Sequence, residues 1–137
     1  MSNDQQSIED LVIKSKRAQE IYEKEGSQRL FDIVSQSIAW VIMKPENNEE
    51  LARLAVKETG LGNVSDKIKK NHNKTLGLMG DLKGVVTFGP VSDNKKTGIS
   101  EFLRPKGVVG AVVPSTNPIA TPVNNIINAV KTGNSII

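Results

Sequence analysis

Apolar residues recur at helical spacing through the first eighty residues of the chain. Four segments each carry one apolar stripe, at positions three and four residues apart, and this pattern predicts four amphipathic helices that must pack on one another or on something else. Polar capping residues, Gly and Pro mark their expected ends. In chain order these signals are Ser7 with Asp10 and Gly26; Ser27 and Pro45; Asn47 with Glu50 and Gly60; and Asn63 with Asp66.

At Gly80 the periodicity changes from helical to strand-like. The runs "GVVTFGPV" and "GISEFLRP" are rich in β-branched and aromatic residues, and the polar segment "SDNKKT" separates them. The two runs predict a β-hairpin over residues 84–105. Their mixed faces indicate a ribbon that projects from the body of the protein, with strand edges open to pairing with another chain.

Residues 107–137 have the pattern strand, helix, strand. The run "GVVGAVVP" is nearly continuous in apolar residues, which is typical of a strand buried on both faces of a parallel sheet. A helix with one apolar face follows, and because Pro122 would clash in a helix interior, regular helix is expected from Thr121. Gly133 fits the position after a helix end, and "NSII" begins another apolar strand. This order predicts the opening of a parallel α/β sheet.

Composition narrows the classes of function. The chain has 137 residues, 37% of them hydrophobic and 24% charged, which is typical of a globular protein. It has no Cys, so these residues offer no disulfide, thiolate metal site or cysteine nucleophile. The only His, His72, lacks clustered acids, and we expect no metal site.

The charge and hydropathy of the sequence indicate which partners and which cellular location to expect. A lysine cluster in the fourth predicted helix has no stacking aromatics beside it, so we interpret it as a solvated helix face and expect no nucleic-acid partner. The N-terminus lacks a signal-peptide core and no apolar run is long enough to span a bilayer, so we expect a cytoplasmic protein without a membrane partner. The clustered lysines are Lys67, Lys69, Lys70 and Lys74.

The segment "VVPSTNP" carries the best candidate chemistry. Asn117 falls between a predicted strand end and the start of a helix, the position where open α/β sheets bind ligands. Together with Ser115 and Thr116 it offers polar groups at a helix N-terminus, which favours developing negative charge. The same residue types are ordinary N-caps, so the local pattern leaves capping and chemistry both open. Three asparagines in the following helix form either an exposed polar face or polar groups near the site: Asn124, Asn125 and Asn128.

Two stretches carry a resemblance to a known family. The order of "ELARLAVKETGLGNVSDKIKKN" and "GISEFLRPKGVVGAVVPSTNPIATPVNNIINAVKTGNSII" resembles the N-terminal part of the aldehyde dehydrogenase superfamily, and is most similar to its CoA-acylating branch. That branch includes the aldehyde half of aldehyde-alcohol dehydrogenases and the acylating enzymes of microcompartments and of sulfoacetaldehyde metabolism. The likeness covers about residues 5–137.

The resemblance implies an α/β fold in three consecutive parts. Residues 1–80 would be the helical N-terminal part of a cofactor domain, and residues 81–106 a β-hairpin used as an oligomerisation ribbon. Residues 107–137 would begin a modified Rossmann sheet. The chain lacks a G-x-G-x-x-G motif after its predicted strand. This absence fits the family, which binds NAD(P) without that motif.

The resemblance also implies a reaction and residue roles. The family binds an aldehyde as a thiohemiacetal on a cysteine, transfers hydride to NAD or NADP, and passes the acyl group to CoA. In that scheme the side-chain amide of Asn117 stabilises the oxyanion, and Thr116 replaces the Trp usual in hydrolytic members. The strip that would line the nicotinamide side of the cofactor site is Val113, Pro114, Ser115 and Thr116.

The resemblance places the nucleophilic cysteine, the catalytic domain and the rest of the sheet beyond Ile137. We therefore expect a fragment that cannot catalyse alone, and a parent enzyme that forms homo-oligomers through the hairpin at residues 84–105. Three alternatives stay open at this point. The chain could be a non-catalytic oligomerisation module, a fragment of a hydrolytic aldehyde dehydrogenase, or an unrelated helical domain with a β-ribbon.

Overall fold

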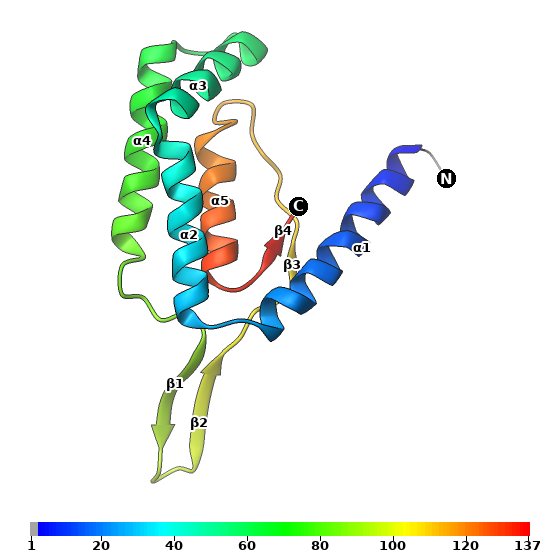
Figure 1. The fold of residues 1–137 in the computed structure, drawn as a ribbon, viewed down its shortest axis with the longest axis vertical. Coiled ribbons are helices and arrows are strands. Elements are labelled where there is room, and N and C mark those ends of the chain that lie inside the picture. The colour runs from blue at the N-terminus through cyan, green and yellow to red at the C-terminus, as the bar shows by residue number, and fades with distance from the viewer. Residues whose placement is uncertain (1–2) are drawn as a thin grey trace. The chain divides into compact units, whose positions relative to one another are not determined.

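The computed structural model describes residues 3–137, and their side chains from residue 6 onward. The fold is helix-rich with short strands, and Figure 1 shows the order of its elements. In chain order they are α1 (Asn3–Lys24), α2 (Gln28–Met43), α3 (Pro45–Thr59), α4 (Val64–Asp81), β1 (Gly89–Asn94), β2 (Ile99–Leu103), β3 (Val108–Val109), α5 (Ala120–Lys131) and β4 (Ser135–Ile136).

The chain divides into two compact units, each made of segments that are discontinuous in sequence. The first unit consists of Met1–Asp32, Val86–Ala111 and Ala129–Ile137. The second consists of Ile33–Val85 and Val112–Asn128. Both α2 and α5 contribute residues to each unit.

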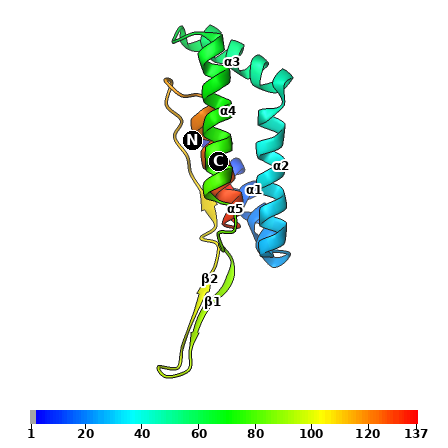
Figure 2. The same ribbon diagram turned by 90° about the vertical axis from the view of Figure 1, so that its left-hand side faces the viewer.

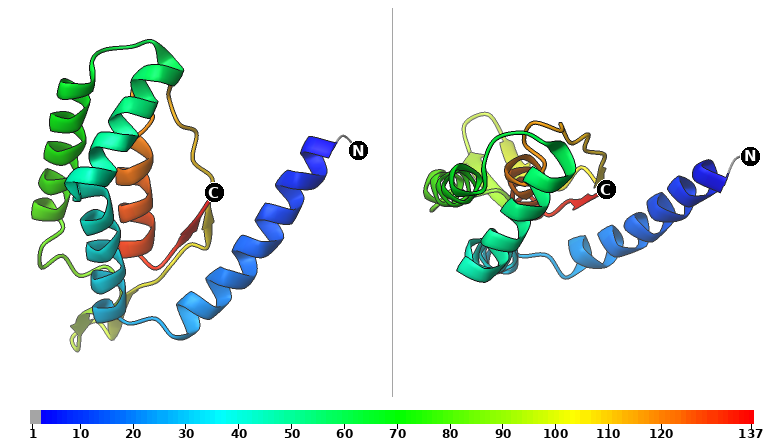
Figure 3. Two further views of the ribbon diagram at one scale, coloured as in Figure 1. Left: turned by 45° about the horizontal axis from the view of Figure 1, so that its top comes forward. Right: turned by 90° about the horizontal axis from the view of Figure 1, so that it is seen from above.

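Strands β3 and β4 form a parallel pair in the first unit. In this pair Val108 of β3 lies opposite Ser135 of β4, which confirms the predicted parallel pairing. Helix α1 packs against β4, as Figure 3 shows. The side chain of Gln19 fixes this contact, because its amide donates to the Gly133 carbonyl at 2.8 Å and accepts from the Ser135 backbone N–H.

Phe31 is the aromatic centre of the first unit and is 0% exposed. The rings of Tyr22 and Phe88 pack on it, with centroids 4.8 and 5.1 Å away. Gly133 follows α5 with φ of 75°, as predicted for a glycine at a helix C-terminus. A Cβ at Gly133 would also lie 2.5 Å from the Phe31 ring, so both backbone conformation and packing require glycine there.

The predicted hairpin is confirmed, but its first strand begins later than expected. Strand β1 pairs antiparallel with β2, and Asn94 closes the turn by accepting the Lys96 backbone N–H at 3.0 Å. Residues 84–88 stay outside the β-ladder. Gln28 Oε1 accepts hydrogen bonds from the backbone N–H groups of Thr87 and Phe88, at 2.6 and 3.1 Å, so these groups do not pair with β2. Apart from half-buried Gly89, the residues of both strands are exposed, and Figure 2 shows them as a narrow two-stranded ribbon.

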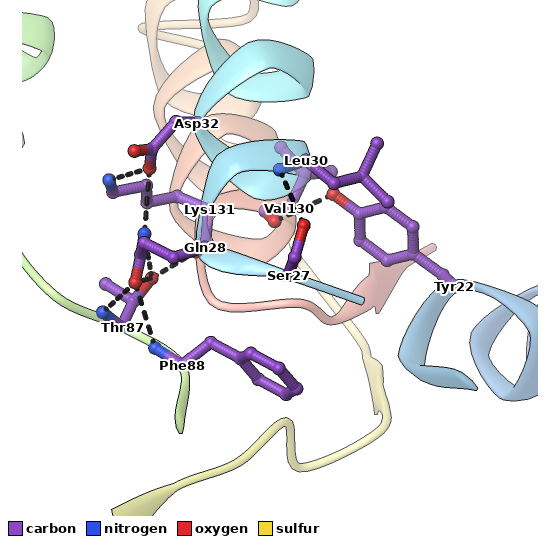
Figure 4. A network of polar contacts seen from close by, with 9 residues as sticks. All are labelled: Tyr22, Ser27, Gln28, Leu30, Asp32, Thr87, Phe88, Val130 and Lys131. Carbon is purple, nitrogen blue, oxygen red and sulfur yellow. Dashed lines mark hydrogen bonds and ion pairs between the residues drawn. The ribbon is translucent and has the colours of Figure 1, made fainter. Parts of the chain in front are cut away.

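A polar network within the first unit holds the segment that leads into this hairpin (Figure 4). The amide of Gln28 donates to Asp32 Oδ1 at 2.8 Å, and Lys131 forms an ion pair with the same carboxylate. The Thr87 hydroxyl donates to the Lys131 carbonyl oxygen. Burial raises the pKa of Asp32, but hydrogen bonds from Lys131 and Gln28 and the charge of Lys131 outweigh it, so that the pKa lies below its usual value.

Helices α3 and α4 pack together in the second unit through a pair of buried asparagines. The amide of Asn71 donates to Asn48 Oδ1 at 2.9 Å, and the amide of Asn48 donates to the Ile68 carbonyl at 3.0 Å. The apolar core of this unit lies between α2, α4 and α5. It comprises Ile38, Ala39, Ile42, Leu78, Met79, Leu82, Ile119, Val123 and Ile127.

Two of the predicted N-caps are confirmed and two are wrong. Ser27 accepts the Leu30 N–H at 3.1 Å, and Asn63 accepts the Asp66 N–H at 2.9 Å. Ser7 lies inside α1, because the polar residues before it continue the helix from Asn3. Asn47 lies inside α3, which starts at Pro45, since proline suits a first helical position where its missing N–H costs nothing.

The expectation of a strand buried on both faces over residues 107–114 is wrong. Strand β3 covers only Val108–Val109, and Val112 is 96% exposed. Within residues 3–137, β4 is the one strand that pairs with β3, so the residues after β3 have no neighbouring strand to cover them. Helix α5 begins at Ala120, one residue before the expected start, because Pro122 falls in its first turn, where backbone N–H groups lack helical acceptors.

Candidate functional site

Asn117 lies in the loop between β3 and α5 and is half-buried. Its backbone N–H donates to the Pro114 carbonyl at 3.3 Å, and its carbonyl accepts the Thr121 N–H at 3.4 Å. These bonds join the turn at residues 114–117 to the first turn of α5. These backbone bonds therefore hold the "PSTNP" segment in place at the start of α5. Asn117 lies two residues before the N-cap position.

The side-chain amide of Asn117 has a defined orientation. Lys70 of α4 donates a hydrogen bond from Nζ to Asn117 Oδ1. Lys70 occupies Asn117 Oδ1, and Asn117 Nδ2 has no hydrogen-bond acceptor among the described residues. An asparagine held in this way offers two N–H donors to a ligand.

A pocket of about 420 Å³ lies next to Asn117 within the second unit, and we call it the α4–α5 pocket. Its walls are one face of α4 and one face of α5, together with Asn117 itself. The three asparagines that sequence left unassigned line it, so they lie beside the candidate site. The lining residues are Lys70, Lys74, Asn117, Ala120, Thr121, Asn124, Asn125 and Asn128.

The α4–α5 pocket is polar and positively charged. Its lining includes Lys70 and Lys74 but no Asp or Glu. Buried Asn124 Oδ1 has no hydrogen-bond partner among the described residues, so a bound donor group would satisfy it. Lys70 is exposed, as predicted for a solvated helix face, but it also contacts a residue 47 positions away. No local pattern could reveal that pairing.

The four residues predicted to line the cofactor site lie elsewhere. Val113, Pro114, Ser115 and Thr116 are exposed and do not line the α4–α5 pocket. They precede Asn117 in the loop between β3 and α5. Their role toward a cofactor stays a prediction.

The described part of the chain lacks metal-binding clusters and membrane-spanning helices. Residues 3–137 contain no group of three or more His, Cys, Asp or Glu side chains placed to hold a metal ion. None of the helices described has the length and apolar character needed to cross a bilayer.

Comparison with known proteins identifies the relatives of this chain, although no protein-family model matches it. The acylating sulfoacetaldehyde dehydrogenase of Cupriavidus necator is 48% identical over 132 residues, which cover 96% of this chain and 27% of that enzyme. The acetylating succinate-semialdehyde dehydrogenase of Clostridium kluyveri is 36% identical over 137 residues, covering 100% of this chain and 29% of that enzyme. The chain therefore spans little more than a quarter of these relatives.

Comparison with solved structures finds the same kind of enzyme as the sequence comparison. An acetylating aldehyde dehydrogenase from Geobacillus thermoglucosidasius matches with a TM-score of 0.88 and 34% identity, over 96% of this chain and 28% of that one. An engineered glycolyl-CoA reductase with bound NADP+ matches with a TM-score of 0.73 and 32% identity, over 91% and 27%. The chain belongs to the CoA-acylating branch of the aldehyde dehydrogenase superfamily and corresponds to the N-terminal part of those enzymes.

Proposed function

We propose that this chain works as the N-terminal part of an enzyme that oxidises an aldehyde to an acyl thioester. The reaction would convert aldehyde, CoA and NAD(P)+ to acyl-CoA, NAD(P)H and a proton. The observation that carries the proposal is the amide of Asn117, held by Lys70 at the edge of a polar pocket. The position of this asparagine in the "PSTNP" motif matches the family's oxyanion donor.

The chemical role of Asn117 follows from charge development at the aldehyde. When a thiolate attacks the carbonyl carbon, the carbonyl oxygen gains negative charge, and an N–H donor placed beforehand stabilises that charge. Asn117 would donate from Nδ2 to this oxygen. The chain has no cysteine, so the thiolate would come from outside these 137 residues.

Lys70 would act as a positioning residue for Asn117. Its ammonium group holds Oδ1, which fixes the direction of the Nδ2 hydrogens. It also draws electron density toward the amide oxygen, and this polarisation makes the N–H groups better donors. An amide that is already oriented needs no reorganisation when the oxyanion forms.

The cofactor proposal rests on the loop after β3. Bound NAD(P)+ would accept hydride from the substrate carbon, and CoA would accept the acyl group. Residues 113–116 would contact the nicotinamide side, since they are exposed in the loop between β3 and α5, and open α/β sheets bind ligands in the loops that follow their strands.

The remaining segments would serve the cofactor domain and assembly. Residues 1–80 and 107–137 would belong to the cofactor domain of a cytoplasmic enzyme. The hairpin at residues 84–105 would join subunits of a homo-oligomer, because its two strands are exposed and each leaves one edge unpaired within the described residues.

Product identification tests this proposal. We expect the full-length protein that carries this segment to form NAD(P)H and an acyl-CoA thioester in equal amounts when given an aldehyde, CoA and NAD(P)+. Absorbance at the nicotinamide band and mass spectrometry of the thioester measure the two products. A protein that binds a full-length subunit stably but forms neither product would instead support the oligomerisation module.

A further inference from the structure

Two lysines give the α4–α5 pocket its charge. Lys70 and Lys74 lie on successive turns of α4, about 6 Å apart along the helix axis, and both line the pocket. No carboxylate belongs to the lining. A ligand in this pocket therefore meets a positive potential at one wall and amide groups at the other.

The two lysines differ in their existing partners. Lys70 donates to Asn117 Oδ1. Lys74 has no hydrogen bond or ion pair within residues 3–137 that the structure describes. Lys74 is thus the lining cation available to a ligand, and Asn124 and Asn125 on α5 line the same pocket.

We propose that the substrate is a short aldehyde that carries an anionic group, a sulfonate or a carboxylate, and that Lys74 binds this group. The inference rests on the proposed function and names its substrate class. Lys70 holds the oxyanion donor, and Lys74 lies one helical turn, about 6 Å, farther along α4. Both groups line one pocket of about 420 Å³, so an aldehyde that reaches both has a short chain.

The pocket offers little to an uncharged aldehyde. Ala120 contributes the only wholly apolar side chain to the lining, so a hydrocarbon tail would bury little apolar surface there. An uncharged tail would also displace water from the Lys74 ammonium group without replacing its interactions, which is unfavourable. Charge therefore decides which aldehydes this pocket selects.

Steady-state kinetics of the full-length protein test the assignment with a matched pair of aldehydes, succinate semialdehyde and butanal, which have the same carbon number. We expect Lys74→Met to raise KM for succinate semialdehyde at least 10-fold and to change KM for butanal less than 2-fold. Lys74→Arg should keep most of the preference for the anion. Lys69→Met removes an exposed lysine of α4 outside the pocket and should change neither value.

The outcomes separate this inference from the proposed function. Butanal oxidation without a preference for the anionic aldehyde, or equal KM changes for both aldehydes in Lys74→Met, would overturn the anion assignment and leave the dehydrogenase function standing. If neither aldehyde is oxidised, the function is wrong, and calorimetric titration with unreactive sulfoacetate tests the pocket by itself. We expect sulfoacetate to bind and Lys74→Met to weaken binding at least 10-fold; no binding to the wild-type protein would contradict the assignment.

Discussion

Asn117→Ala is expected to lower the turnover number of the full-length enzyme about 100- to 1,000-fold. The substitution removes the N–H donor that would stabilise the oxyanion and leaves the Lys70 ammonium without its amide partner. Cofactor affinity should change little, because the loss falls on an interaction that forms in the transition state. Stopped-flow measurement of NAD(P)H formation, together with titration of the cofactor, checks both parts.

The matched control for Asn117→Ala is Asn73→Ala, which makes the same chemical change at an exposed position of α4 outside the pocket. Asn73→Ala should keep wild-type turnover. A kinetic isotope effect with deuterated aldehyde shows whether hydride transfer limits the rate. Turnover of Asn117→Ala near the wild-type value, with a full isotope effect, would refute the oxyanion role.

Asp32→Ala is expected to reduce the free energy of unfolding by about 2–3 kcal/mol. The Lys131 side chain is 4% exposed, so loss of the carboxylate leaves its charge buried without a counterion. Gln28 also loses an acceptor at 2.8 Å. The expected loss is smaller than for a fully buried pair because Asp32 is 37% exposed to solvent. Urea denaturation of wild-type and variant proteins measures the difference.

The effect of Asp32→Ala should depend on pH. Because the folded state lowers the pKa of Asp32, its ionised form stabilises the protein above about pH 4, the usual value for an unfolded Asp. This contribution disappears as the pH falls through the folded pKa. The difference between wild type and variant should therefore be full at pH 7 and shrink below pH 4.

A double variant separates the unpaired charge from lost packing. Asp32→Leu combined with Lys131→Met removes both charges and should recover most of the stability, since replacing both members of a buried pair is often neutral. Glu20→Ala, which removes an exposed carboxylate of α1, should have little effect. If the double variant were as unstable as Asp32→Ala, the buried-charge explanation would fail.

Local signals predicted the elements where short-range contacts decide the structure. The caps at Ser27 and Asn63 depend on neighbours within a few residues, as does the positive φ of Gly133, and all three are confirmed. The start of β1 could not be predicted, because Gln28, 59 positions earlier in sequence, takes the Thr87 N–H. Side chains that bind distant backbone groups leave no periodic pattern.

In the candidate site, too, the features set by neighbouring residues could be predicted, and those set by distant contacts could not. The position of Asn117 between strand and helix follows from its neighbours, and the family resemblance supplied a role for it. The contact of Lys70 with Asn117 and the convergence of α4 with the asparagines of α5 depend on tertiary packing. The asparagines of α5 at helical spacing were the one signal of a polar face, but the sequence did not show what lay opposite.

NAD(P)H formation by the full-length protein in the absence of CoA tests the central claim most directly. An acylating enzyme should form at most one NAD(P)H per active site and then stop, because the acyl group remains on the thiol, and added CoA should restore turnover and release acyl-CoA. Continued NAD(P)H formation with release of free acid in the absence of CoA would contradict the account and place the protein in the hydrolytic branch.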